Sequence, residues 1–196
     1  MALFLVTAPA IEPVSLAEAK AHCRVDVADE DALIDTLRVA ARQYVETFTR
    51  RPLITQTWDD KRDGFPCGSD EALELPLPPV SSITSVTYTA TDGTSTVWSS
   101  ALYTTDLPTG PKAEPARIVP IYGEVYPTTR SVINNVVIRF VAGYGSTAAT
   151  VPASLRAAIK LLIGHWYERR EPVNVGNIVT PIPLSIESLL WPYRAF

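Results

Sequence analysis

The chain has 196 residues, a formal net charge of −4, 46% hydrophobic residues and 19% charged residues. A chain of this length and apolar content can bury a substantial core, which excludes a largely disordered protein. The acidic balance argues against a dedicated nucleic-acid binder, because binding to phosphate relies on cationic side chains that release counterions. No run approaches the roughly 18 apolar residues of a membrane-spanning helix, so no membrane partner is expected.

Two helices are predicted in the first 50 residues. Ser15 can cap a short helix over about 16–23, and Glu18, three positions later, can complete a capping box. A second helix is predicted from the acidic cluster at 29–31 to near residue 49, since acidic side chains suit the positive end of the helix dipole. Five apolar residues at helical spacing predict a core-facing stripe on this helix, with Ile34 and Val45 on its flank: Leu33, Leu37, Ala41, Tyr44 and Phe48.

From about residue 53 to 144 the pattern changes to short alternating segments rich in threonine, which favour strands. Asp92 and Gly93 lie between two such segments and predict a tight hairpin turn in which both residues have positive φ. Further strands are predicted within three runs: 102–104, 116–119 and 135–142. The middle of the chain is therefore expected to form a small antiparallel sheet.

A third helix is predicted to open at Pro152 and to end with Arg169 and Arg170. Its core face is predicted from one-sided spacing, by Leu155, Ile159, Leu162, Ile163 and Trp166. The elements together predict an α+β fold in which N-terminal and C-terminal helices pack together and a central antiparallel β-rich excursion projects from them. A single domain over 1–196 is expected, with helical parts at about 13–50 and 151–196 and the excursion at about 53–145.

The C-terminal tail is rich in apolar and aromatic residues that must be covered. Either the tail docks on its own domain, or it is buried in a partner chain, as exposed apolar patches usually are. The candidate partner interface comprises eight residues of this tail: Ile182, Leu184, Ile186, Leu189, Leu190, Trp191, Tyr193 and Phe196.

Catalytic and metal-binding signatures are absent from the sequence: it contains no GxSxG elbow, Walker loop, GxGxxG or HExxH motif. His22 and Cys23 are neighbours on a predicted helix and point about 100° apart, so they are poorly placed as a catalytic pair. The acidic clusters at 29–31 and 59–60 are interpreted as solvated charge or helix caps, and His165 as a surface or interface histidine. No catalytic residue, metal or cofactor is therefore expected. Reduced thiols are the default for Cys23 and Cys67, and the sequence leaves a single disulfide between them open.

Several motifs, taken in order, resemble the head-tail connector (adaptor) family of tailed bacteriophages, prophages and gene-transfer particles. The motifs of the first half are Pro13–Lys20, Asp29–Ile34, Ala41–Glu46 and Leu53–Trp58. Those of the second half are Arg117–Tyr122, Arg139–Gly145, Val151–Ile159, His165–Glu171 and Leu189–Arg194. The resemblance covers nearly the whole chain and is weakest over 64–111.

This resemblance implies a structural virion protein without enzymatic activity. It implies a ring adaptor, a dodecamer, between the portal protein and the next head-completion or tail protein, such as a stopper or tail terminator. DNA would pass through as cargo. The expected location is the head-tail junction of a virion assembled in the bacterial host cytoplasm.

Two alternatives from other classes stay open. A β-module could bind a carbohydrate or small ligand on an aromatic surface made of Trp58, Tyr88, Trp98 and Tyr103. A cysteine hydrolase would use Cys23 or Cys67 with His165.

Overall fold

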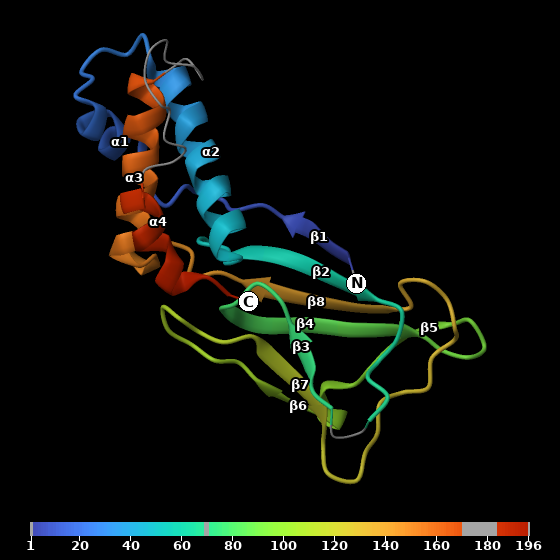
Figure 1. Ribbon diagram of the computed structural model, residues 1–196. Helices are drawn as coiled ribbons and strands as arrows, with labels where there is room; N and C mark the ends of the chain where they lie inside the picture. The colour runs from blue at the N-terminus through green and yellow to red at the C-terminus, as the bar shows by residue number, and fades with distance from the viewer. Residues whose placement is uncertain (1, 69–70, 170–183, 196) are drawn as a thin grey trace. The chain divides into compact units, whose positions relative to one another are not determined.

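The computed structural model describes residues 2–68, 71–169 and 184–195. The chain forms two compact units, a helical one from residues 10–54 and 145–196 and a β-rich one from residues 1–9 and 55–144. Four α-helices and two antiparallel sheets make up the described part of the chain (Figure 1). The predicted α+β class is confirmed. No helix in the described ranges is both long and apolar enough to cross a membrane.

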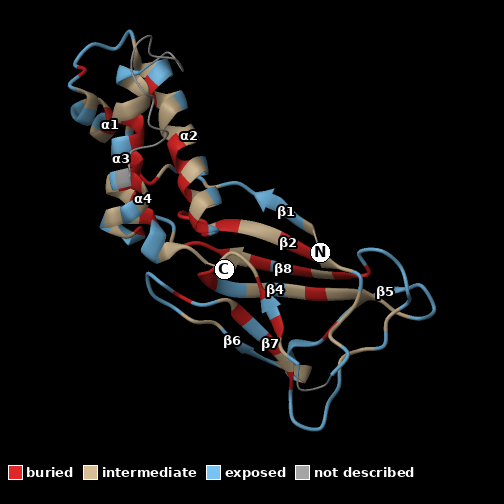
Figure 2. Ribbon diagram, viewed as in Figure 1, coloured by how far each residue is buried: buried red, intermediate tan, exposed pale blue. Residues whose placement is uncertain are grey.

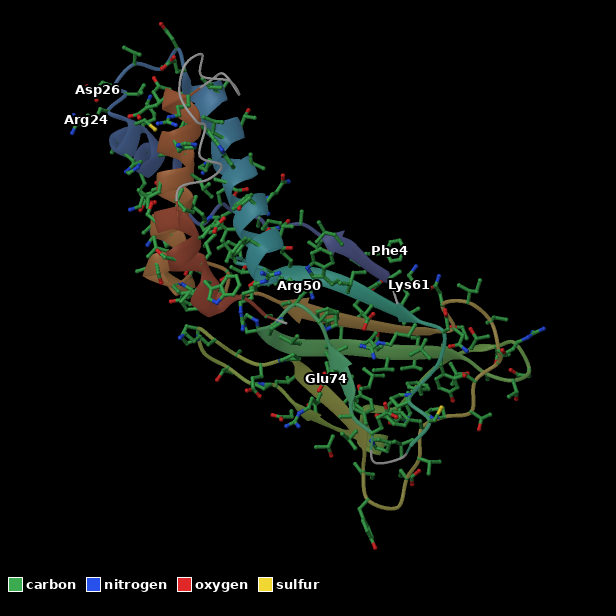
Figure 3. All side chains as sticks on the ribbon, in the orientation of Figure 1. Phe4, Arg24, Asp26, Arg50, Lys61 and Glu74 are labelled. Carbon is green, nitrogen blue, oxygen red and sulfur yellow. The ribbon has the colours of Figure 1, made fainter. Side chains whose placement is uncertain are left out.

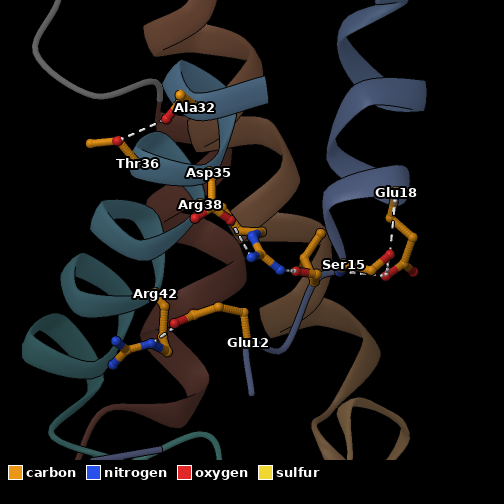
Figure 4. Close-up of polar contacts among 9 residues, drawn as sticks. Glu12, Ser15, Glu18, Ala32, Asp35, Thr36, Arg38 and Arg42 are labelled. Carbon is orange, nitrogen blue, oxygen red and sulfur yellow. Dashed lines mark hydrogen bonds and ion pairs between the residues drawn. The ribbon is translucent and has the colours of Figure 1, made fainter. Parts of the chain in front are cut away.

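The helical unit begins with α1 (Leu16–Cys23), whose predicted capping box is present. The Glu18 backbone N–H donates to the Ser15 hydroxyl at 3.2 Å, and the Ser15 backbone N–H donates to a Glu18 carboxylate oxygen at 2.9 Å (Figure 4). These two bonds satisfy donors that a helix start otherwise leaves open. Helix α1 ends at Arg24, which has a left-handed backbone with φ 57°.

Helix α2 (Asp31–Thr49) has the predicted extent, but its buried face differs from the predicted stripe. Ile34, Ala41 and Val45 are fully buried, whereas Leu33 is 37% exposed. The residues assigned to the flank therefore form the centre of the core face, and Leu33 lies outside it. Of the predicted stripe, Ala41 is buried, and Leu37, Tyr44 and Phe48 are half-buried. The prediction was wrong for Leu33, because a broad apolar surface does not by itself say which side another helix covers.

Helix α3 (Ala153–Glu168) packs against both α1 and α2. Four of its five predicted core residues are fully buried: Leu155, Ile159, Leu162 and Ile163. The fifth, Trp166, is half-buried and meets the ring of Tyr44 edge-on at a centroid distance of 6.3 Å. Tyr44 also stacks on Phe48 at 6.2 Å, so α2 and α3 are joined by aromatic as well as aliphatic contacts.

A buried arginine adds a polar contact to this helical core. Arg42 is 8% exposed, and it donates to the carboxylate of Glu12 at 2.8 Å (Figure 4). It also donates to the carboxylate of Glu46 at 2.6 Å. Glu46 in turn accepts the backbone N–H of Leu53 at 2.9 Å. The segment before α1 and the segment after α2 are thus both bonded to the same helix.

The β-rich unit contains a five-stranded sheet in the order β1-β2-β8-β4-β5 and a three-stranded sheet in the order β3-β7-β6. Every pairing is antiparallel. The strands are β1 (Ala2–Thr7), β2 (Gln56–Arg62), β3 (Leu73–Leu75), β4 (Val80–Thr89), β5 (Ser95–Val97), β6 (Tyr103–Asp106), β7 (Ala116–Pro120) and β8 (Val136–Ala142). The sequence predicted a central antiparallel sheet but did not identify β1 or β3 as strands.

One apolar core lies between the two sheets of this unit. Strand β8 is central, and its buried side chains alternate along the strand, as expected when one face of a sheet is covered. The buried cluster combines residues of both sheets: Leu73, Leu75, Val80, Val86, Ala116, Ile118, Val136, Ile138, Phe140 and Ala142, together with Trp98.

The predicted hairpin joins β4 to β5, but its turn differs from the expected one. Ala90 donates its N–H to the carbonyl of Thr94 at 2.8 Å, and Gly93 donates to the carbonyl of Ala90 at 2.9 Å. Only Gly93 has a positive φ, of 94°, so the loop has three residues rather than two. Asp92 contributes its side chain instead, which accepts the N–H of Thr94 at 2.9 Å.

Candidate partner interface

The C-terminal segment was the predicted interface, and the structure attaches part of it to the helical unit. Helix α4 (Leu184–Leu190) packs on α3 and α2 and continues into a short 3-10 turn, η3 (Trp191–Tyr193). The Arg51 Nε donates to the backbone oxygen of Tyr193, and the Ala195 N–H donates to the carbonyl of Thr49 at 2.9 Å. The tail therefore docks on its own chain at this point, which was one of the two alternatives.

The eight predicted interface residues have different environments. Ile186 and Leu190 are 2% and 0% exposed, so the chain itself covers them, while Leu189 and Tyr193 are half-buried. Leu184 is the first residue of α4. Ile182 and Phe196 lie outside the described residues. The structure brings Ile186 and Leu190 together in the helical core and leaves Trp191 on the surface.

Among the described residues of this segment, Trp191 is the exposed aromatic one, with 58% of its surface accessible. The guanidinium of Arg194 lies 5.4 Å from the Trp191 ring centroid and 5.6 Å from that of Phe48. A cation over an aromatic face at this distance is favourable and restricts both side chains. Trp191 is thus held in place without being covered, which is the property of an anchor side chain at a protein interface.

A second exposed apolar surface, which the sequence analysis did not identify, is strand β1. Leu3, Phe4, Leu5 and Val6 are 36–48% exposed, and Figure 2 shows the strand largely in the colour of exposed residues. The sequence signal was an uncharged run of apolar residues at 2–6, but such a run alone does not distinguish a buried strand from an exposed one.

A third exposed group lies on the loop between β7 and β8. Tyr122, Val125 and Ile133 are 106%, 66% and 82% exposed. Tyr126 anchors this loop, because its hydroxyl lies 2.8 Å from the carbonyl oxygen of Glu71 and 3.0 Å from that of Ile118. The loop therefore presents apolar side chains from a fixed backbone.

The aromatic residues proposed as a ligand-binding surface form part of the β-unit core instead. Trp98 is 4% exposed, and its ring lies 4.7 Å from Tyr103, 5.4 Å from Phe65 and 5.5 Å from Tyr126, measured between centroids. Tyr88 contacts the same Phe65 at 6.0 Å. Because these rings cover one another, Trp98 presents no free face on which a sugar could stack.

The chemistry around Cys23 is opposite to that of a catalytic thiol. Burial raises the pKa of the Cys23 thiol, and the nearby carboxylate of Glu168 raises it further. A nucleophilic cysteine needs the reverse, a pKa lowered by cations or by a helix N-terminus. Cys23 and Cys67 both have free thiols in the structure.

Three residues of the acidic clusters at 29–31 and 59–60 pair with basic side chains. Asp59 binds Arg139 through two hydrogen bonds, of 2.8 and 2.9 Å, and these bonds lower the pKa of Asp59. Asp60 pairs with Arg62 at 2.8 Å, and Asp31 pairs with Lys20. Over the ranges that the structure describes, no three metal-ligating side chains cluster.

Comparisons with known proteins agree with the resemblance in the sequence. The family model for "Phage gp6-like head-tail connector protein" matches residues 13–94. A chain of the structure described as "Neck of empty GTA particle computed with C6 symmetry" is 26% identical, with a TM-score of 0.79, over 100% of this chain and 96% of the other. No curated protein matches.

Two further structures share the fold over the same extents, 100% of this chain and 96% of the other. The one described as "Virion of native gene transfer agent (GTA) particle" has 24% identity and a TM-score of 0.80. The one described as "Neck of native GTA particle computed with C12 symmetry" has 22% identity and a TM-score of 0.76. The resemblance to head-tail connector proteins that the sequence motifs indicated is confirmed by these matches.

Proposed function

We propose that this connector forms a ring adaptor between the portal and the next head-completion or tail protein, a stopper or tail terminator. The ring leaves a central channel through which DNA passes. It contains twelve copies, lies at the head-tail junction and is assembled in the cytoplasm of the bacterial host.

The observation that carries this proposal is the likeness, over the full chain, to a chain of a gene-transfer-particle neck. A match over both units is stronger support than a match over the family region alone, because each unit has its own core. The twelvefold symmetry applied to one neck particle supports a ring of twelve copies.

Charge supports a channel that passes DNA without binding it. The segments 1–9 and 55–144 of the β-rich unit contain ten acidic and six basic residues, so this unit holds the whole net charge of −4. An acidic surface repels phosphate, and it lacks the cations that a tight contact with DNA requires. A duplex can therefore move past such a surface.

Ring closure requires heterologous contacts, in which two different surfaces of one copy meet. Trp191 provides one anchor for such a contact or for the portal, with the half-buried Leu189 beside it. Ile186 and Leu190 of α4 are buried, so they attach the helix that precedes Trp191 to the helical unit.

The proposal is tested by native mass spectrometry of the purified chain with and without purified portal. The chain alone is expected as a monomer or weak oligomer, and portal is expected to template a complex with one connector chain per portal chain. A tight closed ring at nanomolar concentration without portal would contradict the templating step. No association with portal at micromolar concentrations would contradict the adaptor role.

A further inference from the structure

Strand β1 is an edge strand without the usual protection of an edge. It is the outermost strand of the five-stranded sheet, and its partner among the described residues is β2. Proteins normally guard an edge with charge, proline or very short strands, because an unpaired backbone edge can accept another strand. The sequence Ala2-Leu-Phe-Leu-Val-Thr7 contains no charged residue, proline or glycine.

Both faces of β1 are open to solvent. Side chains alternate along a strand, so Leu3 and Leu5 lie on the face opposite to Phe4. All three are 36–48% exposed, and β1 contributes no side chain to the buried cluster of its unit. Strand β1 thus has exposed apolar side chains on both faces, and among the described strands only β2 pairs with its backbone.

The other sheet edges are protected in the normal way. Strands β3 and β5 have three residues each, and β6 has four and ends at Asp106, which pairs with Arg117. Thr104 and Thr105 of β6 are exposed but polar. The open apolar edge is therefore a specific property of β1 within the two sheets.

The charged residues near β1 indicate which kind of strand could pair with its open edge. Asp59 and Asp60 on β2 are neutralised by Arg139 and Arg62. Lys61 extends over the ring of Phe4, with its Nζ 4.4 Å from the centroid (Figure 3). An incoming strand thus meets apolar side chains and one cation, so an apolar segment without basic residues fits best.

Symmetry excludes β1 of a second copy as the partner. Pairing of β1 with itself is isologous and closes as a dimer, whereas a ring needs two different surfaces to meet. The contact is also too small to hold a complex alone. The regular pairing of β1 ends at a register shift after Leu5, so only Ala2–Leu5, about 13 Å of strand, can pair regularly with a further strand. Four residues are few beside the roughly 20–30 residues per partner of a standard interface.

We propose that β1 accepts a sixth strand, an extended apolar segment without basic residues, from a different protein of the head-tail junction. The strand pairs with Ala2–Leu5, and other surfaces hold the assembly so that this short contact forms at high effective concentration. The proposal rests on the adaptor function proposed above.

The test places a photo-crosslinking benzoylphenylalanine at Leu5, and in a control variant at Thr104, in complexes of the chain with portal and the next head-completion protein. Mass spectrometry of the Leu5 variant is expected to identify an apolar peptide of one of those two proteins, and the Thr104 variant is expected to give no such product. A product with another copy of this chain, or no product in a complex that forms, overturns the strand proposal and leaves the adaptor function standing. If no complex forms, both fail.

Hydrogen exchange and charge substitution give independent readouts. Backbone amides of residues 3–5 that face the open edge are expected to exchange at least tenfold more slowly in the complex than in the isolated chain. Leu3→Lys combined with Leu5→Lys is expected to weaken the association at least tenfold at an unchanged thermal transition, whereas Thr104→Lys leaves it unaltered. Unchanged exchange, or full affinity of the double variant, would contradict the proposal.

Discussion

The hydroxyl groups of Ser154 and Tyr193 lie 2.7 Å apart and join the first turn of α3 to the turn that follows α4. Arg51 donates to the backbone oxygen of the same Tyr193. The last residue of this turn, Tyr193, is thus bonded to the helical unit through both its side chain and its backbone. Trp191, two residues earlier, therefore has a defined position although its ring is mostly exposed.

Leu190 and Trp191 are consecutive but have different expected roles. Leu190 is fully buried, so Leu190→Ala is expected to lower the free energy of unfolding by about 2–5 kcal/mol through lost burial and a cavity. Urea unfolding of the isolated chain measures this loss. A change below about 0.5 kcal/mol would mean that α4 does not belong to the core of the helical unit.

Trp191→Ala is expected to leave the unfolding transition nearly unchanged and to weaken association with portal. Truncation of an anchor tryptophan removes about 2–4 kcal/mol of binding free energy, which corresponds to roughly 30-fold to 900-fold in affinity. Titration of portal with the parent chain and with Trp191→Ala gives the ratio of their dissociation constants. Ser188→Ala, at an exposed position of α4, is the matched control. A variant that unfolds several degrees lower yet binds portal normally would assign Trp191 to the parent core.

Local signals in the sequence were sufficient where neighbours in the chain determine the structure. Ser15 and Glu18 are three residues apart and make the capping box that their spacing predicts. Burial on α2 was different, because Ile34 and Leu33 are equally apolar and the position of α3 decides which one is covered. Leu190 and Trp191 in the candidate interface are likewise both apolar, and tertiary packing decides that Leu190 is buried while Trp191 is exposed.

Strand β1 could not be predicted from its own residues, since the β2 residues that pair with it are 50 to 59 positions away. Its pattern also lacks alternation, because neither face of the strand is covered. The sequence correctly predicted a hairpin at Asp92 and Gly93, but it predicted a two-residue turn where the structure has a three-residue loop. A two-residue and a three-residue loop accept the same Asp-Gly pair, and the register of β4 with β5 selects between them.

The capping box predicts a specific dependence of stability on pH. The pKa of Glu18 is lowered, mainly because its carboxylate accepts the backbone N–H of Ser15, and further by the Ser15 hydroxyl and Arg156. A carboxyl with a depressed pKa stabilises the fold above its unfolded pKa, about 4.3, and this contribution is lost as the pH falls through the folded value.

Gln can still complete the capping box, so Glu18→Gln removes the charge alone and is expected to destabilise the chain by about 0.5 kcal/mol at pH 7. The difference should shrink below about pH 4.3. Urea titrations of both proteins between pH 3 and pH 7 check this. A difference that stays constant across the range would show that the ionised carboxylate has no special role.

Tyr126 is expected to stabilise the loop between β7 and β8 through its hydroxyl. The group is shared between the carbonyls of Glu71 and Ile118, so Tyr126→Phe is expected to destabilise the chain by about 1 kcal/mol. Hydrogen exchange should also accelerate over 121–134 more than in β8. Equal acceleration in both regions would indicate a global effect rather than a loop anchor.

The adaptor role is tested most directly by electron-microscopy imaging of purified portal after incubation with this chain. The account predicts an added ring with twelvefold symmetry, coaxial with the portal and open at its centre. Particles that show bare portal, or connector chains bound at scattered positions without a common axis, would contradict it.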